Sequence, residues 1–206
     1  RLYTGPHERA WVERITRATA NGAASAAASY AILAPTSRWP AKRWPADRFA
    51  RVAESLLSTF NSVILVGGPN ELDQIIPLSE LSSRNAKVIN LVGHTSVAQL
   101  MALIQSSSLV IANDSAALHM AVGFDRPSIA LFGPTATQLV GPYQKHNRSA
   151  DSRVIQHITP TDMLDHKDPA QTRLMTRISV EEVLEATEDG PDNSGPPHGP
   201  GIDVRL

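Results

Sequence analysis

The chain has 206 residues and no cysteine. This excludes disulfides and thiolate metal sites, and cysteine usage therefore gives no information on the redox compartment. It also lacks an excess of either charge: 19 Lys and Arg stand against 20 Asp and Glu, for a formal net charge of −1. General binding to nucleic acid or to a membrane surface needs a basic excess. We therefore expect no nucleic-acid partner, and any bound anion must be held locally.

Long hydrophobic runs are missing as well. No apolar stretch approaches the roughly 18 to 20 residues that cross a bilayer, and Arg1 does not open a signal peptide. We expect no transmembrane segment and a cytoplasmic location. Since the chain starts at Arg1 without a Met, we also expect it to be an excised piece of a longer protein. With 42% hydrophobic and 19% charged residues, its composition is that of an ordinary globular protein.

The segment 109–134, LVIANDSAALHMAVGFDRPSIALFGP, has the pattern of a strand, a helix and a second strand, the unit that builds parallel sheets. Three good N-cap residues, Asn113, Asp114 and Ser115, precede the helical spacing. A helix that begins beyond the carboxyl end of a strand directs free N–H groups and a partial positive charge at a ligand, most often a phosphate. His119, four residues after Ser115, is expected near the same opening. Ordinary helix capping and a packing histidine remain the alternative.

Similar alternation precedes this segment. Apolar runs predict strands at 30–34, 62–66, 87–90, 109–112 and 129–132, and helical spacing predicts helices at 46–60, 71–81 and 96–105. Further along, we expect an edge strand at 154–158 and a capped helix at 179–186. This alternation predicts an α/β fold with a doubly wound parallel sheet, Rossmann-like in class.

The regular pattern does not extend over the whole chain. Within residues 1–29 we expect a helix at 6–20, followed by a linker of small residues. Residues 30–187 carry the Rossmann-like pattern, and 188–206 are dense in Gly, Pro, Asp and Ser, so we expect a disordered tail. We predict three parts with these boundaries.

A second segment with candidate ligand-binding side chains follows the first predicted strand. It places the hydroxyls of Thr36 and Ser37 and the cations Arg38, Lys42 and Arg43 within eight positions. A parallel sheet would bring them to the edge where the 109–134 helix begins. Hydroxyls and cations there can hold a diphosphate, Lys as a point charge and Arg as a bidentate fork. A basic surface loop packed between two tryptophans is the alternative.

Two weaker signals follow other strands. Gly67 and Gly68 permit close backbone approach to a ligand, and Glu71 could accept a hydrogen bond from a ribose hydroxyl, although Gly-Gly-Pro is more often a simple turn. The run 132–137, FGPTAT, is a Gly-Pro turn with two hydroxyls.

Taken in order, the stretches APTSRWPAKRWPADRFA, VILVGGPNE, NLVGHTSVAQLMALIQSSSLVIANDSAALHMAV and RPSIALFGPT resemble the C-terminal half of the family 9 glycosyltransferases, the lipopolysaccharide heptosyltransferases. The resemblance runs from about Tyr30 to Tyr143. It implies a GT-B architecture, in which two Rossmann-like domains face one cleft, with this chain as the nucleotide-sugar-binding domain. The donor it implies is typically an ADP-heptose.

The resemblance also implies site residues. The donor diphosphate would be held by Thr36, Ser37 and Lys42 and by an Asp-Thr-Gly-x-x-His segment, which reads here Asp114, Ser115, Ala116, Ala117, Leu118, His119. Ser115 replaces Thr conservatively. Ala116 replaces Gly, which restricts backbone approach. His119 would orient the phosphates. From its position after the second predicted strand, rather than from the resemblance, we expect Glu71 to serve the nucleoside.

The expected chemistry follows from charge. A departing nucleoside diphosphate gains negative charge, so Lys42, the hydroxyls and the helix start would stabilise the transition state, with Lys42 as the catalytic residue. Such a site needs no metal and no cofactor. The acceptor-binding domain and the catalytic base of the family lie in the N-terminal half, which would precede Arg1. We therefore expect a chain that binds donor but does not transfer sugar alone, whose parent enzyme could lie peripherally at the inner membrane.

Two alternatives stay open at this stage. The first is another nucleotide-sugar enzyme, a UDP-sugar transferase of GT-B type or an epimerase, since Glu71 alone does not define an adenine pocket. The second is a non-catalytic α/β module whose nucleotide site has been lost, an interpretation with which the replacement of Gly by Ala116 is consistent.

Overall fold

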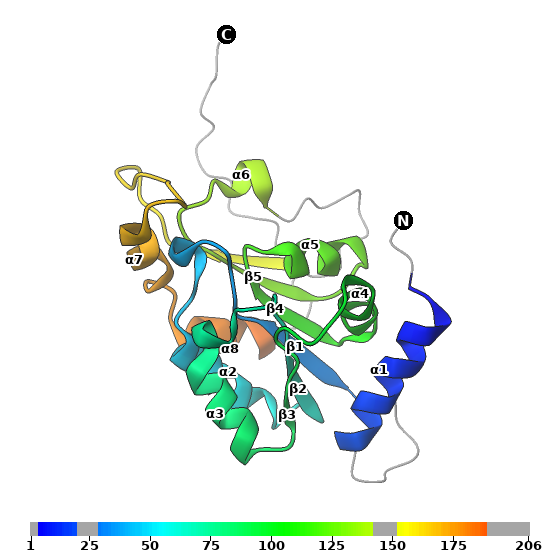
Figure 1. Ribbon diagram of the computed structural model, residues 1–206. Coiled ribbons are helices and arrows are strands. Elements are labelled where there is room, and N and C mark those ends of the chain that lie inside the picture. Colours follow the sequence, from blue (N-terminus) through cyan, green and yellow to red (C-terminus); the bar gives the residue numbers. More distant parts are fainter. Residues whose placement is uncertain (1–3, 20–28, 142–151, 189–206) are drawn as a thin grey trace.

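A computed structural model describes residues 4–19, 29–141 and 152–188 of the chain (Figure 1). Within them, six strands form one parallel sheet: β1 (Tyr30–Ala34), β2 (Ser62–Leu65), β3 (Val88–Asn90), β4 (Leu109–Asn113), β5 (Ser128–Phe132) and β6 (Ser152–Gln156). Their order is β3-β2-β1-β4-β5-β6, and every pairing is parallel. The predicted Rossmann-like, doubly wound sheet is confirmed.

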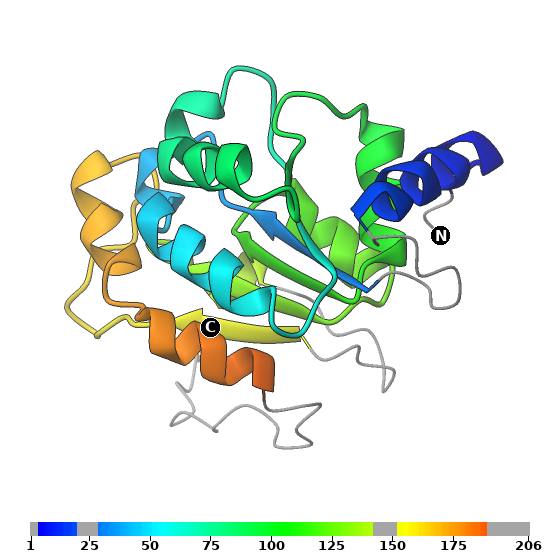
Figure 2. The ribbon, with the colours of Figure 1, turned by 90° about the horizontal axis from the view of Figure 1, so that it is seen from below.

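Helices cover both faces of this sheet (Figures 1 and 2). The α-helices are α1 (Pro6–Thr19), α2 (Ala46–Leu56), α3 (Ile76–Arg84), α4 (Val97–Ser106), α5 (Ala116–Gly123), α6 (Thr137–Val140), α7 (Thr172–Met175) and α8 (Val180–Glu188), and the 3-10 helices are η1 (Pro40–Lys42), η2 (Leu72–Ile75) and η3 (Pro169–Gln171). Alternate strand residues face opposite ways, so Ile32 belongs to the core under α4 and α5, whereas Leu33 belongs to the core under α2, α3 and α8. None of the helices in the described ranges combines the length and apolarity that a bilayer span requires.

Several boundaries differ from the expected ones. The helix expected at 46–60 ends at Leu56, and the helix expected at 71–81 divides into η2 and α3. Asn70 precedes this division with φ 64°, and Pro77 lies in the first turn of α3, where a missing N–H costs nothing. The predicted edge strand exists as β6, two residues earlier than expected. Glu188 ends α8 rather than opening a tail.

Helix α1 is more closely tied to the sheet domain than the expected division at residue 29 suggests. Val12 is buried in the core under α4 and α5, and the hydroxyl of Thr4 donates to the side chain of Gln105 at the end of α4. In Figures 1 and 2, α1 (blue) lies beside the sheet at the side of α4. The expected linker at 21–29 and tail at 188–206 fall almost wholly outside the described residues, so the three-part division stays a prediction.

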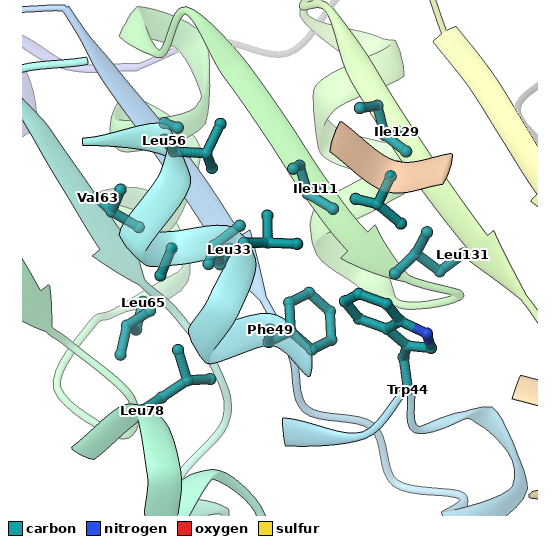
Figure 3. Close-up of a cluster of buried hydrophobic side chains, with 14 of the residues drawn as sticks. Leu33, Trp44, Phe49, Leu56, Val63, Leu65, Leu78, Ile111, Ile129 and Leu131 are labelled. Atoms are coloured by element: carbon teal, nitrogen blue, oxygen red, sulfur yellow. The ribbon is translucent and has the colours of Figure 1, made fainter. Parts of the chain in front are cut away.

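The loop that follows β1 is anchored in the core by Trp44 (Figure 3). The indole ring is buried and meets the ring of Phe49 edge-on at 4.9 Å between centroids. Its Nε1 donates to the backbone oxygen of Ile178 at 3.0 Å, which satisfies the polar atom of the buried ring. The same loop is therefore fixed to the segment that leads into α8.

Asn113 fixes this loop from the other side. Its side chain is fully buried at the end of β4, where Nδ2 donates to the oxygen of Pro35 at 2.7 Å and Oδ1 accepts from the N–H of Trp44 at 3.2 Å. One amide thus holds both ends of the loop 35–44. Because β1 and β4 are neighbours at the point where the strand order reverses, this loop borders the crevice in which α/β sheets bind ligands.

The segment that follows β6 is clasped by Asp162. Its carboxylate accepts from Arg177 at 2.5 and 3.1 Å, from Arg173 at 2.9 Å and from the N–H of Thr159 at 2.8 Å. The Arg177 guanidinium, followed by the N–H of Thr159, holds the pKa of the Asp162 carboxyl well below its ordinary value. The clasp therefore depends on the ionised form of Asp162.

Replacing Asn113 should loosen the loop after β1. Asn113→Ala leaves the Pro35 oxygen and the Trp44 N–H buried without partners, so we expect a loss of about 2–4 kcal/mol in the free energy of unfolding. Urea titration followed by circular dichroism measures it. Asn61→Ala, at an exposed asparagine that bonds Ser29, is the matched control and should cost less than about 1 kcal/mol. Equal losses in the two variants would show that the tether does not matter.

Acid should release the Asp162 clasp. Since the pKa of Asp162 is lower in the folded than in the unfolded state, its stabilisation is complete above the unfolded value of about 4 and fades as the pH falls below it. We expect Asp162→Asn to melt below the wild type at pH 7, with the gap narrowing toward pH 2.5. Thermal melts across this range measure it. Asp73→Asn, at an exposed carboxylate of η2, is the matched control and should melt close to the wild type at pH 7.

Candidate functional site

A cavity of about 400 Å³ lies at the carboxyl ends of β1, β2 and β4. Its apolar walls come from Ala34, Val66 and Leu100. The rest of the lining, which carries the polar groups, comes from the loops after β1 and β2 and from the starts of α4 and α5: Thr36, Ser37, Arg38, Trp39, Gly67, Gly68, Pro69, Glu71, Thr95, Ser96, Val97, Asp114, Ser115, Ala116 and Ala117. The cavity occupies the topological switch point of the sheet, the usual ligand position in this fold.

Lys42 and Asp114 form an ion pair across the switch point. Lys42, the last residue of η1, places Nζ 2.5 Å from Oδ2 of Asp114, which directly follows β4. The two side chains are only 14% and 7% exposed. The cationic loop and the start of α5 therefore meet at one edge of the sheet, as the parallel pattern requires. Asp114 lines the cavity and Lys42 lies behind it, paired and mostly covered.

The start of α5 is not capped in the expected way. Ser115 occupies the N-cap position with extended backbone, but its side chain makes no capping bond, and its Oγ is buried without a partner among the described residues. Asn113 and Asp114, the other two candidate caps, hold the loop 35–44 and Lys42 instead. The first N–H groups of α5 thus lack a Ser115 side-chain cap beside the cavity, where an anion could accept from them.

A second helix start, that of α4, also faces the cavity and was not singled out from the sequence. Here Ser96 caps the helix: its Oγ accepts from the N–H of Gln99 at 3.2 Å, and the Gln99 side chain accepts from the N–H of Ser96 at 2.8 Å. The Ser-x-x-Gln spacing at 96–99 is a sequence signal for such a helix start. Its partial positive charge adds to that of α5.

Thr36 and Ser37 line the cavity and are nearly buried, at 5% and 7% exposure. The N–H of Ser37 donates to Oε1 of Gln74 at 3.1 Å, which holds the backbone of the loop against η2. Gly67 makes this approach possible, because a Cβ at that position would lie 2.6 Å from Oγ1 of Thr36. Gly67 therefore serves the packing of the two loops.

Glu71 and His119 are placed differently from one another. Glu71 lines the cavity, and its Oε2 accepts from the N–H of Gly68 at 2.6 Å, which leaves Oε1 without a protein partner among the described residues. His119 is exposed and is not among the residues that line the cavity. Four residues along a helix amount to a rise of about 6 Å, which carries His119 away from the opening at which Ser115 lies.

The arrangement suits an elongated, partly apolar anion. The start of α5 and the hydroxyls of Thr36 and Ser37 offer donors, and Ala34, Val66 and Leu100 supply apolar walls. Among the described residues, His, Asp and Glu side chains do not gather in threes around a point where a metal ion could bind.

Comparison with known proteins identifies a family. The family model described as "Glycosyltransferase family 9 (heptosyltransferase)" matches residues 5–168. Lipopolysaccharide heptosyltransferase 2 of Salmonella typhimurium is 33% identical over 155 residues, covering 73% of this chain and 42% of that protein.

Solved structures give the same result. The E. coli ADP-heptose lps heptosyltransferase II matches with a TM-score of 0.69 at 25% identity, over 91% of this chain and 52% of that one. The glycosyl transferase family 9 structure from Veillonella parvula matches with a TM-score of 0.71 at 26% identity, with the same coverage. The chain thus spans about half the length of the relatives it matches. By sequence and by fold, the chain belongs to glycosyltransferase family 9, the heptosyltransferases.

Proposed function

We propose that this chain is the donor-binding domain of a heptosyltransferase and that the cavity holds a nucleotide sugar, an ADP-heptose. The observation that carries the proposal is the meeting of Thr36, Ser37 and the start of α5 beside the Lys42–Asp114 pair at the switch point. The E. coli relative named for ADP-heptose, which matches 91% of this chain, supports the choice of donor.

In this proposal the diphosphate lies between the loop after β1 and the start of α5. Thr36 and Ser37 donate their hydroxyl hydrogens to phosphate oxygens, and the free N–H groups of α5 beyond Ser115 and Ala116 do the same. The nucleoside occupies the aliphatic end of the cavity, where Oε1 of Glu71 accepts from a ribose hydroxyl.

Lys42 acts when the bond between the sugar and the diphosphate breaks. An ammonium group has three N–H donors, and Asp114 accepts one of them, which leaves two for the departing phosphate. Asp114 also holds the ammonium in place, so its position costs little reorganisation as negative charge develops on the leaving group. His119, on the exposed side of α5, would reach the phosphates only by a change of rotamer or of loop position, and its orienting role stays a prediction.

The whole reaction also needs an acceptor site and a base. The relatives are about twice as long as this chain, and we assign both parts to the remaining half of a two-domain GT-B enzyme. On this proposal, the chain is the C-terminal half, acts in the cytoplasm, binds donor and transfers no sugar by itself.

Nucleotide binding should be selective and should depend on Lys42. We expect the chain to bind ADP in calorimetric titration and to bind UDP at least about tenfold more weakly. Lys42→Ala should weaken ADP binding about tenfold or more, because it removes a charged hydrogen-bond donor. Lys87→Ala, at an exposed lysine before β3, is the matched control and should bind like the wild type.

The outcomes separate the proposed function from its alternatives. Tighter binding of UDP would indicate another nucleotide-sugar enzyme, and binding of neither nucleotide would indicate an inert module. Unchanged ADP affinity in Lys42→Ala would show that Lys42 does not contact the diphosphate. Because Lys42→Ala leaves Asp114 mostly buried and unpaired, the double variant Lys42→Gln/Asp114→Asn, which keeps a neutral pair, checks that lost binding is not lost folding.

Transfer should fail with the isolated chain. We expect no release of ADP above the blank when the purified chain is mixed with ADP-heptose and a lipid A-core acceptor, because the acceptor site and the base are in the other half. A full-length family 9 heptosyltransferase in the same assay is the positive control. Turnover by the isolated chain would contradict the proposal that it is only a donor domain.

A further inference from the structure

The cavity is lined by one cationic side chain within the described ranges, and it is that of Arg38. Lys42, four positions later, lies outside the lining, and its charge is compensated by Asp114 at 2.5 Å. Arg38 is exposed, and within the described residues it has no carboxylate within ion-pair distance. The uncompensated positive charge at the cavity wall is therefore that of Arg38.

The guanidinium of Arg38 is held by an aromatic neighbour. Its central carbon lies 5.3 Å from the ring centroid of Trp39, a stacked cation–π arrangement. Trp39 is in turn met edge-on by His166, at 5.3 Å between centroids and 75° between ring planes. His166 belongs to the segment after β6, so residues from distant parts of the chain position the arginine.

The backbone beneath Arg38 is held as well. Nε of Arg43 donates to the oxygen of Ser37 at 2.8 Å, and Nη2 of Arg43 donates to the oxygen of Arg38 at 3.3 Å. The N–H of Trp39 donates to Oγ of Ser37 at 3.4 Å. These bonds curl the loop so that Arg38 and Trp39 stand on the cavity wall beside the Ser37 hydroxyl.

We propose that Arg38, positioned on Trp39, is the residue that binds the phosphate end of the nucleotide sugar from the solvent side of the cavity. This inference rests on the proposed function. It assigns the stabilisation of the negatively charged phosphates to two cations with different roles. Arg38 forms the initial, bidentate contact with phosphate oxygens, for which the planar guanidinium is suited. Lys42, held by Asp114, donates to the diphosphate once it is bound and stabilises it as the bond to the sugar breaks. Trp39 is a positioning residue, because it acts through Arg38.

The division of labour follows from desolvation. Lys42 and Asp114 are mostly buried together and present little net charge to an approaching anion. The exposed guanidinium of Arg38, which has no carboxylate partner among the described residues, can bind a phosphate without first breaking an ion pair. Stacking on Trp39 leaves the N–H edge of the guanidinium free to donate while its orientation is already restricted.

Calorimetric titration of the chain with ADP, AMP and adenosine tests the inference. We expect Arg38→Ala to weaken ADP binding about tenfold or more and to leave adenosine binding unchanged, with AMP in between. Arg38→Lys should recover only part of the loss, since an ammonium does not form the bidentate contact. Arg51→Ala, at an exposed arginine paired with Glu181, is the matched control and should bind ADP like the wild type.

Trp39 provides a second, independent readout. Trp39→Leu should weaken ADP binding by a smaller factor than Arg38→Ala, and Trp39→Phe should restore it, because a phenyl ring keeps the cation–π contact. In the Arg38→Ala background, Trp39→Leu should have no further effect on ADP affinity, whereas a purely structural role of Trp39 would add its own loss.

The results distinguish this inference from the proposed function. If the wild type binds ADP and Arg38→Ala binds it equally well, or if adenosine binding falls in parallel with ADP, the role of Arg38 is overturned and the donor site stands. If the wild type binds neither ADP nor UDP, the proposed function fails, and the assignment of Arg38 fails with it.

Discussion

The tether between β4 and the loop after β1 is the constraint on which the cavity depends. In a doubly wound sheet, the chain leaves two neighbouring strands toward opposite faces and opens a crevice between them. Here Asn113 bonds both ends of the loop 35–44, and Asp114 pairs with Lys42 within it. Two consecutive residues of one strand end therefore determine where the hydroxyls and cations of a distant segment stand. The crevice is a defined cavity because these bonds hold the loop 35–44 at its edge.

Much of the fold could be predicted because its determinants are local. Short, mostly apolar runs identified five strands almost to the residue, and parallel topology required their carboxyl ends to share one edge. The meeting of Lys42 with the start of α5 is a consequence of that topology. The packing of α1 was not predictable in the same way, since its apolar stripe is short and its partner, α4, lies about ninety positions away.

The side-chain arrangement of the site was less accessible from the sequence. N-cap propensity ranks Asn113, Asp114 and Ser115 alike, yet each does something else: one tethers a loop, one pairs with a lysine, and one keeps a buried hydroxyl without a partner. Propensity describes what a residue can do locally, whereas long-range partners decide what it does. The same holds for Trp39, whose ring contacts both the adjacent Arg38 and His166, more than a hundred positions later.

The segment 157–188 supports the site although none of these described residues lines the cavity. Ile178 accepts the indole N–H of Trp44, and α7 packs on η1, where the oxygen of Pro40 accepts from the Thr172 hydroxyl at 3.3 Å. Gly133 allows the loop after β5 to pack closely on α7 and η1, because a Cβ there would lie 2.7 Å from Sδ of Met175 and 3.1 Å from the oxygen of Ala41. The helix that carries Lys42 is thus packed between the loop after β5 and α7. Removing α7 and α8 would take Met175, Ile178 and Val183 out of the core and remove the support of the cationic loop, so the cavity and these helices form one structural unit.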